Sequence, residues 1–110
     1  MTYKGGCHCG RIAFEVEGNL EQVMDCNCSI CTKRGYLHWF VGRDQLNLQT
    51  PESTLVTYTF KTGKYKHHFC ANCGCAPFVI AADGASINAR CLEGVDLSAL
   101  KVTQFDGRSL

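Results

Sequence analysis

The chain has 110 residues, of which 45% are hydrophobic and 19% charged, and its net charge is +1. This size predicts a single domain over residues 1–110, and the near-neutral charge argues against a nucleic-acid or membrane-surface partner. The first residues lack the apolar core of a signal peptide, and no apolar run is long enough to span a bilayer. We therefore expect a cytoplasmic protein.

Short strands dominate the predicted elements. Ile12, Phe14 and Val16 alternate with charged or small residues along 11–17, which is the period-2 pattern of a half-buried strand. Seven further strands are expected over residues 22–26, 37–41, 54–60, 65–69, 78–81, 86–89 and 102–105.

Turns and short helical segments complete the predicted elements. Turns are expected at Gly18-Asn19, Gly63-Lys64 and Asp83-Gly84. Helical signals are limited to a turn near residues 29–34 and one or two turns over 96–100, with Asp96 as the N-cap. The predicted fold class is therefore mainly β, with several small sheets tied together by metal.

Cysteines carry the strongest functional signal. Seven of the nine fall into three clusters, which are Cys7 and Cys9, then Cys26, Cys28 and Cys31, then Cys70 and Cys73. In a reducing compartment such clusters are typical of metal ligands rather than disulfides. Zinc takes four ligands in a structural site, whereas a catalytic site has three protein ligands and an open position. The two pairs predict one closed site and the triplet predicts one open site, giving two zinc ions per chain.

The closed site would join distant parts of the chain. Cys70-x-x-Cys73-Gly74 has the form of a zinc knuckle, and the sulfurs of Cys7-x-Cys9 project to one face of an extended chain. Such a site can contribute on the order of 10 kcal/mol of apparent binding energy. His8 points to the opposite face and is interpreted as a non-ligand. The alternative is that these are buried free cysteines.

The open site would be compact. Cys26-x-Cys28-x-x-Cys31 places three thiolates within six residues, and a divalent zinc leaves them with a net charge of −1. The remaining position suits water or an incoming thiol, and the metal can also polarise a carbonyl group. The alternative is that some of these cysteines close a site with another pair, which would make the protein purely structural.

Several other residues have two interpretations each. Cys75 is either a spare ligand or unrelated to the metal, and Cys91 is interpreted as a buried apolar residue. Lys33 and Arg34 either offset the thiolate charge and steer an anionic substrate, or are solvated surface charges.

Aromatic residues and histidines near the cysteines are also ambiguous. Tyr36, His38, Trp39 and Phe40 either form the wall of a pocket or belong to an aromatic-rich core strand. Of the adjacent pair His67-His68, at most one can reach a shared site, because neighbours on a strand face opposite ways.

The order of the three cysteine motifs resembles one known family. Gly6-Cys7-x-Cys9-Gly10 is followed by Cys26-x-Cys28-Ser29-x-Cys31-x-Lys33-x-Gly35 and then by Phe69-Cys70-x-x-Cys73-Gly74. Together these motifs resemble the glutathione-dependent formaldehyde-activating enzyme family, which shares its domain with centromere protein V. The resemblance runs from about Gly5 to Leu92.

The resemblance implies a β-tent-type fold of small antiparallel sheets that bears zinc. It also implies the ligand sets, with Cys7, Cys9, Cys70 and Cys73 matching a structural zinc site and Cys26, Cys28 and Cys31 matching a second, catalytic one. The activity of the family is the joining of formaldehyde to glutathione to give S-hydroxymethylglutathione, classed with the carbon–sulfur lyases.

Three functional hypotheses follow. The first is a zinc-dependent carbon–sulfur lyase that acts on a glutathione–aldehyde adduct or a related small-molecule thiol. The second is a non-catalytic zinc module that binds another macromolecule. The third is a reductase related to the methionine sulfoxide reductases, which would need Cys91 or Cys75 as an exposed thiol of low pKa with a resolving partner.

Overall fold

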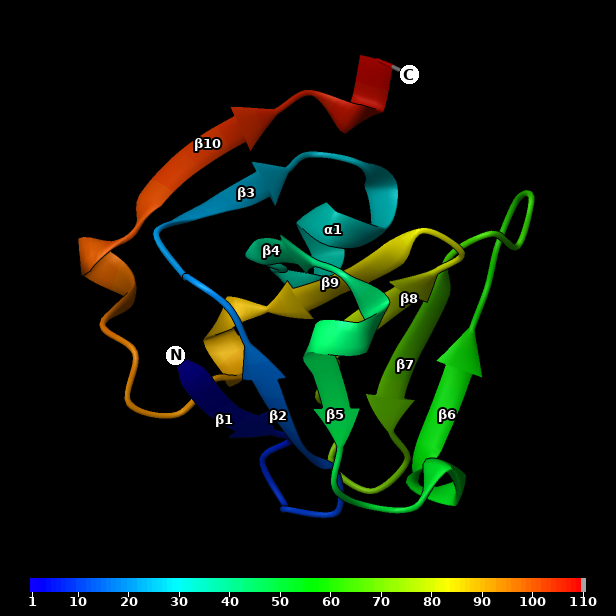
Figure 1. The fold of residues 1–110 in the computed structure, drawn as a ribbon. Coiled ribbons are helices and arrows are strands. Elements are labelled where there is room, and N and C mark those ends of the chain that lie inside the picture. The colour runs from blue at the N-terminus through cyan, green and yellow to red at the C-terminus, as the bar shows by residue number, and fades with distance from the viewer. Residues whose placement is uncertain (110) are drawn as a thin grey trace.

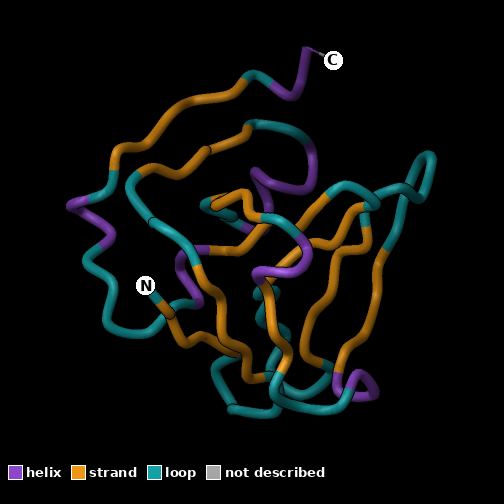
Figure 2. The backbone as a smooth tube through the Cα atoms, viewed as in Figure 1, coloured by secondary structure: helices purple, strands orange, loops and turns teal. Residues whose placement is uncertain are grey.

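A computed structural model describes residues 1–109, and it confirms that the fold is mainly β (Figures 1 and 2). The strands are β1 Thr2–Gly6, β2 Ala13–Glu17, β3 Gln22–Cys26, β4 His38–Val41, β5 Leu46–Leu48, β6 Leu55–Tyr58, β7 Lys66–Cys70, β8 Phe78–Ala81, β9 Gly84–Asn88 and β10 Lys101–Phe105. The α-helix is α1, Ser29–Arg34. Three-residue 3-10 turns occur at Arg43–Gln45, Glu52–Thr54, Ala89–Cys91, Leu97–Ala99 and Gly107–Ser109. Over these residues no helix is long and apolar enough to cross a membrane.

The strands form two sheets. A three-stranded antiparallel sheet has the order β1-β2-β5, and a seven-stranded sheet has the order β10-β3-β4-β9-β8-β7-β6. The pairings within the larger sheet are antiparallel except for β10 and β3, which run parallel from Lys101 opposite Gln22 to Phe105 opposite Cys26. Figure 1 shows β10 lying along β3 at one edge of the molecule. The end of the chain therefore reaches the first cysteine of the predicted triplet.

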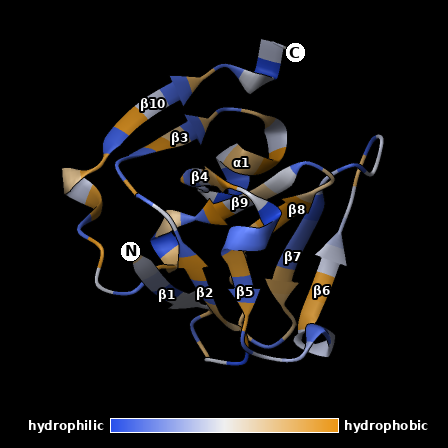
Figure 3. Ribbon diagram, in the orientation of Figure 1, coloured by the Kyte–Doolittle hydropathy of each residue, from blue (hydrophilic) through white to orange (hydrophobic). Residues whose placement is uncertain are grey.

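The core is formed by apolar side chains from both sheets. Phe14 and Val16 of β2 are buried while Glu17 is exposed, as the alternation along this strand predicts. The ring of Phe14 meets that of Phe78 on β8 edge to face, with centroids 5.5 Å apart. Figure 3 shows β8 as hydrophobic along its length, whereas β7 beside it is largely hydrophilic. This hydrophilic strand brings His67 to the cavity described below.

Some element boundaries differ from the predictions. Strands β1 and β5 were not predicted, because glycines interrupt the first and the second has only three residues. The hairpin after β8 turns at Ala82-Asp83, one residue before the predicted position, because Gly84 already pairs with Ala81. The predicted N-cap Asp96 is confirmed, since its carboxylate accepts a hydrogen bond from the Ser98 backbone N–H at 3.1 Å.

Candidate functional site

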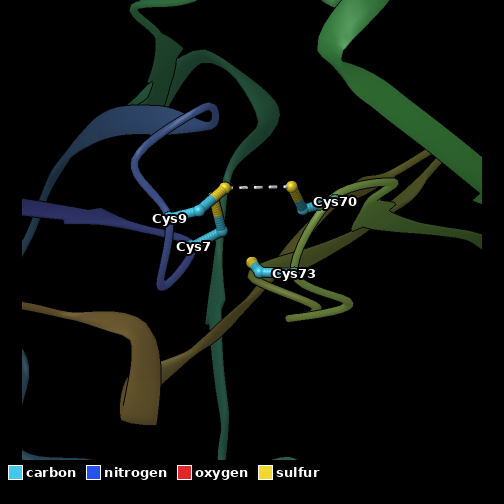
Figure 4. Close-up of side chains that lie close together, drawn as sticks. All are labelled: Cys7, Cys9, Cys70 and Cys73. Atoms are coloured by element: carbon cyan, nitrogen blue, oxygen red, sulfur yellow. Dashed lines mark hydrogen bonds between the residues drawn. The ribbon is translucent and has the colours of Figure 1, made fainter.

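Four cysteines from two distant parts of the sequence converge beside the three-stranded sheet. Cys7 and Cys9 lie in the turn after β1, while Cys70 ends β7 and Cys73 lies in the following turn. Figure 4 shows the two pairs facing each other, and the sulfur atoms of all four lie within 4.8 Å of one another. We call this group the four-cysteine cluster.

The geometry of the four-cysteine cluster fits a tetrahedral metal ion. The sulfurs of Cys7 and Cys9 are 3.7 Å apart, and those of Cys9 and Cys70 are 3.6 Å apart. Zinc–sulfur bonds of about 2.3 Å in a tetrahedron place the sulfurs about 3.8 Å apart. Backbone N–H groups of Ile12 and Asn72 donate to the sulfurs of Cys7 and Cys70 at 3.2 and 3.4 Å. These donors stabilise thiolates, the form that binds metal.

The pKa values within the four-cysteine cluster are pushed apart. The backbone N–H groups of Cys75 and Cys9 lower the pKa of Cys73 to about 5. Burial raises the pKa of Cys7 despite its hydrogen bond from Ile12. Four crowded sulfurs can all ionise only with a cation between them, and four thiolates at these distances are a donor set that fits a metal ion.

The predicted triplet forms a second group, which we call the three-cysteine cluster. Cys26 ends β3, Cys28 is the N-cap of α1, and Cys31 is buried on that helix. Their sulfurs lie within 4.8 Å of one another. Gly35 ends the helix in the left-handed region at φ 68°, a conformation that glycine adopts at little cost. A strand end and one short helix thus bring three sulfurs to one point.

The three-cysteine cluster shows the same crowding of negative charge. Burial, reinforced by the Cys28 and Cys26 side chains, raises the pKa of Cys31 well above its ordinary value. Burial alone would also raise the pKa of Cys28, but the backbone N–H of Cys31 and the neighbouring thiols lower it overall. A divalent cation would relieve the repulsion and allow all three to be thiolates.

His38 of β4 adds a nitrogen beside this cluster. Its Nε2 lies 3.1 Å from the Cys31 sulfur, and its Nδ1 is hydrogen-bonded to the Ser86 hydroxyl on β9. Burial, together with nearby His67, lowers the pKa of His38 to about 4, so the imidazole is neutral near pH 7. If a bound cation makes Cys31 a thiolate, the sulfur can only accept a hydrogen bond, so Nε2 would carry the proton and the Ser86 hydroxyl would donate to Nδ1. This arrangement would fix the tautomer and orient the sulfur.

A cavity of about 580 Å³ opens next to the three-cysteine cluster. All three cysteines line it, together with His38 and His67. The larger apolar residues that line it are Met24, Ile30, Phe40, Phe60, Tyr65, Val79 and Phe105. A metal bound by the triplet would therefore face a chamber large enough for a small molecule.

Behind the cavity wall lies a hydrogen-bonded chain of three side chains. Arg34 donates from Nη1 to the Tyr36 hydroxyl at 3.0 Å, and this oxygen lies 3.4 Å from Nδ1 of His67. The Arg34 guanidinium also stacks over the Phe69 ring, 5.2 Å from its centroid. Burial, followed by the Arg34 charge, lowers the pKa of His67. Arg34 is therefore half-buried and engaged with the residues behind the cavity wall, and it is not the freely solvated charge that was one alternative for it.

The end of the chain forms part of the cavity. Phe105 and Gly107 line it, and a Cβ added to Gly107 would lie 2.6 Å from the Cys26 sulfur. Asn27 holds this segment in place by donating to Asp106 at 2.9 Å and accepting from the Arg108 backbone N–H at 2.9 Å. Sequence reasoning missed this contribution. Residues 102–105 were predicted as a strand, but no local pattern indicated which strand they would pair with.

The structure shows which of the remaining aromatic, histidine and cysteine candidates lie at the cavity or in a cysteine cluster. His38 and Phe40 line the cavity as one alternative predicted, whereas Trp39 packs in the core. Within the described residues, His8 and Cys75 belong to neither cysteine cluster. His68 bonds to Thr57 and faces away from the cavity that His67 lines.

Cys91 does not have the properties of a redox thiol. It is half-buried with its sulfur directed at the Ala76 carbonyl, and burial raises its pKa to about 11. A reductase of the third hypothesis would need an exposed thiol of lowered pKa. The geometry around Cys91 therefore gives that hypothesis no support.

A small mainly β protein with two cysteine clusters, each able to hold a metal ion, is the class that this fold and site define. Residues 2–98 match the family model described as glutathione-dependent formaldehyde-activating enzyme. The chain belongs to this family. Its structure is also similar to the crystal structure of a Rhodobacter sphaeroides protein solved as a structural genomics target. That similarity has a TM-score of 0.81 and 30% identity, over 91% of this chain and 99% of the other.

Proposed function

We propose that this protein is a zinc-dependent carbon–sulfur lyase that makes and breaks the bond between a thiol sulfur and an aldehyde carbon. The observation that carries the proposal is the cavity beside the three-cysteine cluster, because a purely structural metal would need no chamber. Membership of the formaldehyde-activating family supports the reaction class and suggests glutathione or a related small thiol as one substrate.

In this proposal the two clusters have different roles. The four-cysteine cluster holds a structural zinc ion with a complete set of sulfur ligands. The three-cysteine cluster holds a second zinc ion, and the fourth position remains for the substrate. When bound there, zinc favours the thiolate form of a sulfur ligand and can act as a Lewis acid on a carbonyl oxygen.

The protein's own residues then supply orientation and proton transfer. His38, held by Ser86, donates from Nε2 to the Cys31 sulfur and keeps that ligand in place. The neutral His67 also lines the cavity, and its Nδ1 is occupied by Tyr36. Its Nε2 can accept the thiol proton and return it to the aldehyde oxygen as the sulfur–carbon bond forms and the carbonyl π electrons move to oxygen.

The chain's small net charge of +1 supports small-molecule partners over nucleic acid. We also propose a cytoplasmic location, where the cysteines stay reduced. The alternative of a non-catalytic interaction module has no specific observation in its favour.

The test is acceleration of adduct formation. Thiol–aldehyde addition also proceeds without a catalyst, so exchange between free and adduct signals should be measured by NMR with glutathione and formaldehyde, and with benzyl mercaptan and formaldehyde. We expect zinc-loaded protein to accelerate exchange with at least one pair, Cys28→Ser to abolish the acceleration, and Cys91→Ser to retain it. No acceleration with these two pairs or with glutathione and benzaldehyde would refute the lyase proposal. If Cys91→Ser lost the acceleration and Cys28→Ser kept it, the chemistry would depend on the Cys91 thiol, as the reductase hypothesis requires.

A further inference from the structure

The chemical character of the cavity wall restricts what can bind there. Beyond the cysteines, the wall is dominated by aromatic and aliphatic side chains. Three of the aromatic side chains, Phe40, Tyr65 and Phe105, are 60%, 59% and 39% exposed. Exposed aromatic rings that gather at one cavity are a feature of sites that bury apolar ligand surface.

Charged groups are few in the same wall. Among the described residues that line the cavity, the charged side chains are Lys61 and Asp83, which offset each other. Both ring nitrogens of His38 are engaged, Nε2 with the Cys31 sulfur and Nδ1 with the Ser86 hydroxyl, and burial lowers the pKa of His67, so its imidazole is uncharged near pH 7. Arg34 is engaged with Tyr36 and the Phe69 ring and does not line the cavity.

Glutathione is poorly matched to this wall. At neutral pH it carries two carboxylates and one ammonium group, and the cavity has one lysine to receive the two carboxylates. Three thiolates around a divalent ion also carry a net charge of −1, which repels an anionic ligand. Burying carboxylates without partners is costly, whereas burying an apolar body is favourable.

We propose that the adduct handled at this site has an uncharged, apolar body of aromatic size, carried by its thiol or by its aldehyde, and that glutathione is a weak ligand. This inference rests on the proposed function for the position of the sulfur at the three-cysteine cluster. It goes beyond that function because the apolar lining of the cavity and its few charged groups assign the class of substrate. Phe105 and Phe40 are the residues that contact the apolar body, the first from the C-terminal strand β10 and the second from β4.

Binding to zinc-loaded protein without aldehyde tests the substrate class separately from catalysis. Benzyl mercaptan and glutathione both offer a sulfur, so a difference in affinity reports the body attached to it. Amide chemical shifts in NMR titrations give the affinities and the residues contacted. We expect benzyl mercaptan to bind at least about tenfold more tightly, with the largest shifts on β4 and β10. Equal or tighter binding of glutathione, or shifts outside the cavity, would overturn the inference.

Val102, on the same strand as Phe105, supplies a matched control for variants of the aromatic wall. Phe105→Ser and Phe40→Ser should each weaken benzyl mercaptan binding by about tenfold. Val102→Ser should leave it unchanged, because Val102 is also exposed on β10 but does not line the cavity. If all three variants bind like the wild type, the aromatic wall is not the binding surface.

A charge variant tests the other half of the inference. Asp83→Arg places a second cation at the cavity, so glutathione affinity should rise about threefold while that of benzyl mercaptan stays the same. An equal rise for both ligands would contradict the charge argument.

Turnover experiments distinguish the lyase proposal from the proposal of an apolar substrate. They also show whether the apolar body is carried by the thiol or by the aldehyde. Benzyl mercaptan with formaldehyde carries the ring on the thiol, and glutathione with benzaldehyde carries it on the aldehyde. Faster exchange with either pair than with glutathione and formaldehyde supports the inference. If benzyl mercaptan binds tightly but none of these pairs is accelerated, the lyase proposal fails and the ligand assignment stands. If only glutathione with formaldehyde is accelerated, the lyase proposal stands and the apolar assignment fails.

Discussion

The two cysteine clusters should affect global stability by very different amounts. In the four-cysteine cluster, the proposed metal would join Cys9 to Cys70 across a separation of 61 residues. Treated as a cross-link that closes a loop of this length, the metal removes about 4 kcal/mol of chain entropy from the unfolded state. The three-cysteine cluster closes a loop only from residue 26 to residue 31, which is worth about 2 kcal/mol by the same relation.

Single serine substitutions reveal the difference. Cys9→Ser should lose the structural metal and about 4 kcal/mol, a large part of the 5–15 kcal/mol typical of a domain. Cys28→Ser should lose the second metal at a net cost of about 1 kcal/mol. Cys28 is the N-cap of α1 and its side chain makes no capping hydrogen bond, whereas serine is a favoured N-cap worth about 1 kcal/mol.

The assay is guanidinium unfolding in the presence of zinc and a non-thiol reductant, with zinc content measured on the same samples. His8→Ser is the control, because His8 lies between two proposed ligands but is exposed and outside the cluster. It should retain two zinc ions and wild-type stability. Equal destabilisation by Cys9→Ser and Cys28→Ser, or two zinc ions retained in Cys9→Ser, would refute the reasoning. The four-cysteine cluster would then not be the structural metal site, or the three-cysteine cluster would not be the less stabilising one.

Three further predictions concern particular contacts. Gly107→Ala should weaken zinc binding at the three-cysteine cluster about tenfold or more, because the new Cβ would lie 2.6 Å from the Cys26 sulfur. It should not lower stability greatly. Competition with a chelator measures the zinc affinity. Ser86→Ala should release the His38 ring and raise the dissociation constant of the same zinc about tenfold, with zinc at the other cluster unchanged. Phe14→Ala should cost about 3–5 kcal/mol in denaturant unfolding, because its ring is fully buried against the opposite sheet; a loss below about 1 kcal/mol would contradict the core described above.

Local patterns in the sequence were sufficient to predict the fold class and the grouping of the cysteines. The spacing in Cys70-x-x-Cys73 specifies a turn that presents two sulfurs, and the alternation along Phe14 and Val16 specifies a half-buried strand. The structure brings together both predicted sets of cysteines. Their assignment as zinc ligands stays a prediction that metal analysis must test.

The cavity could not be predicted in the same way, because long-range pairing creates it. His38 reaches Cys31 only because β4 pairs with β3, opposing Met24 to His38. Phe105 reaches the cavity because β10 pairs with β3 in parallel, a choice that depends on the whole path of the chain between them. An aromatic residue on a strand has the same local pattern whether it enters a core or faces a ligand.

The C-terminal segment lines the cavity but lies outside the region that the family model matches. The family model matches residues 2–98, which include the seven clustered cysteines, His38 and His67. Phe105 and Gly107 lie beyond the match, yet both line the cavity, and Gly107 approaches the Cys26 sulfur. The residues proposed to hold the metals and move the proton therefore lie within the shared region, while one wall of the cavity comes from outside it. Substitutions at Phe105 would therefore change the shape and polarity of the cavity and leave the cysteine clusters in place.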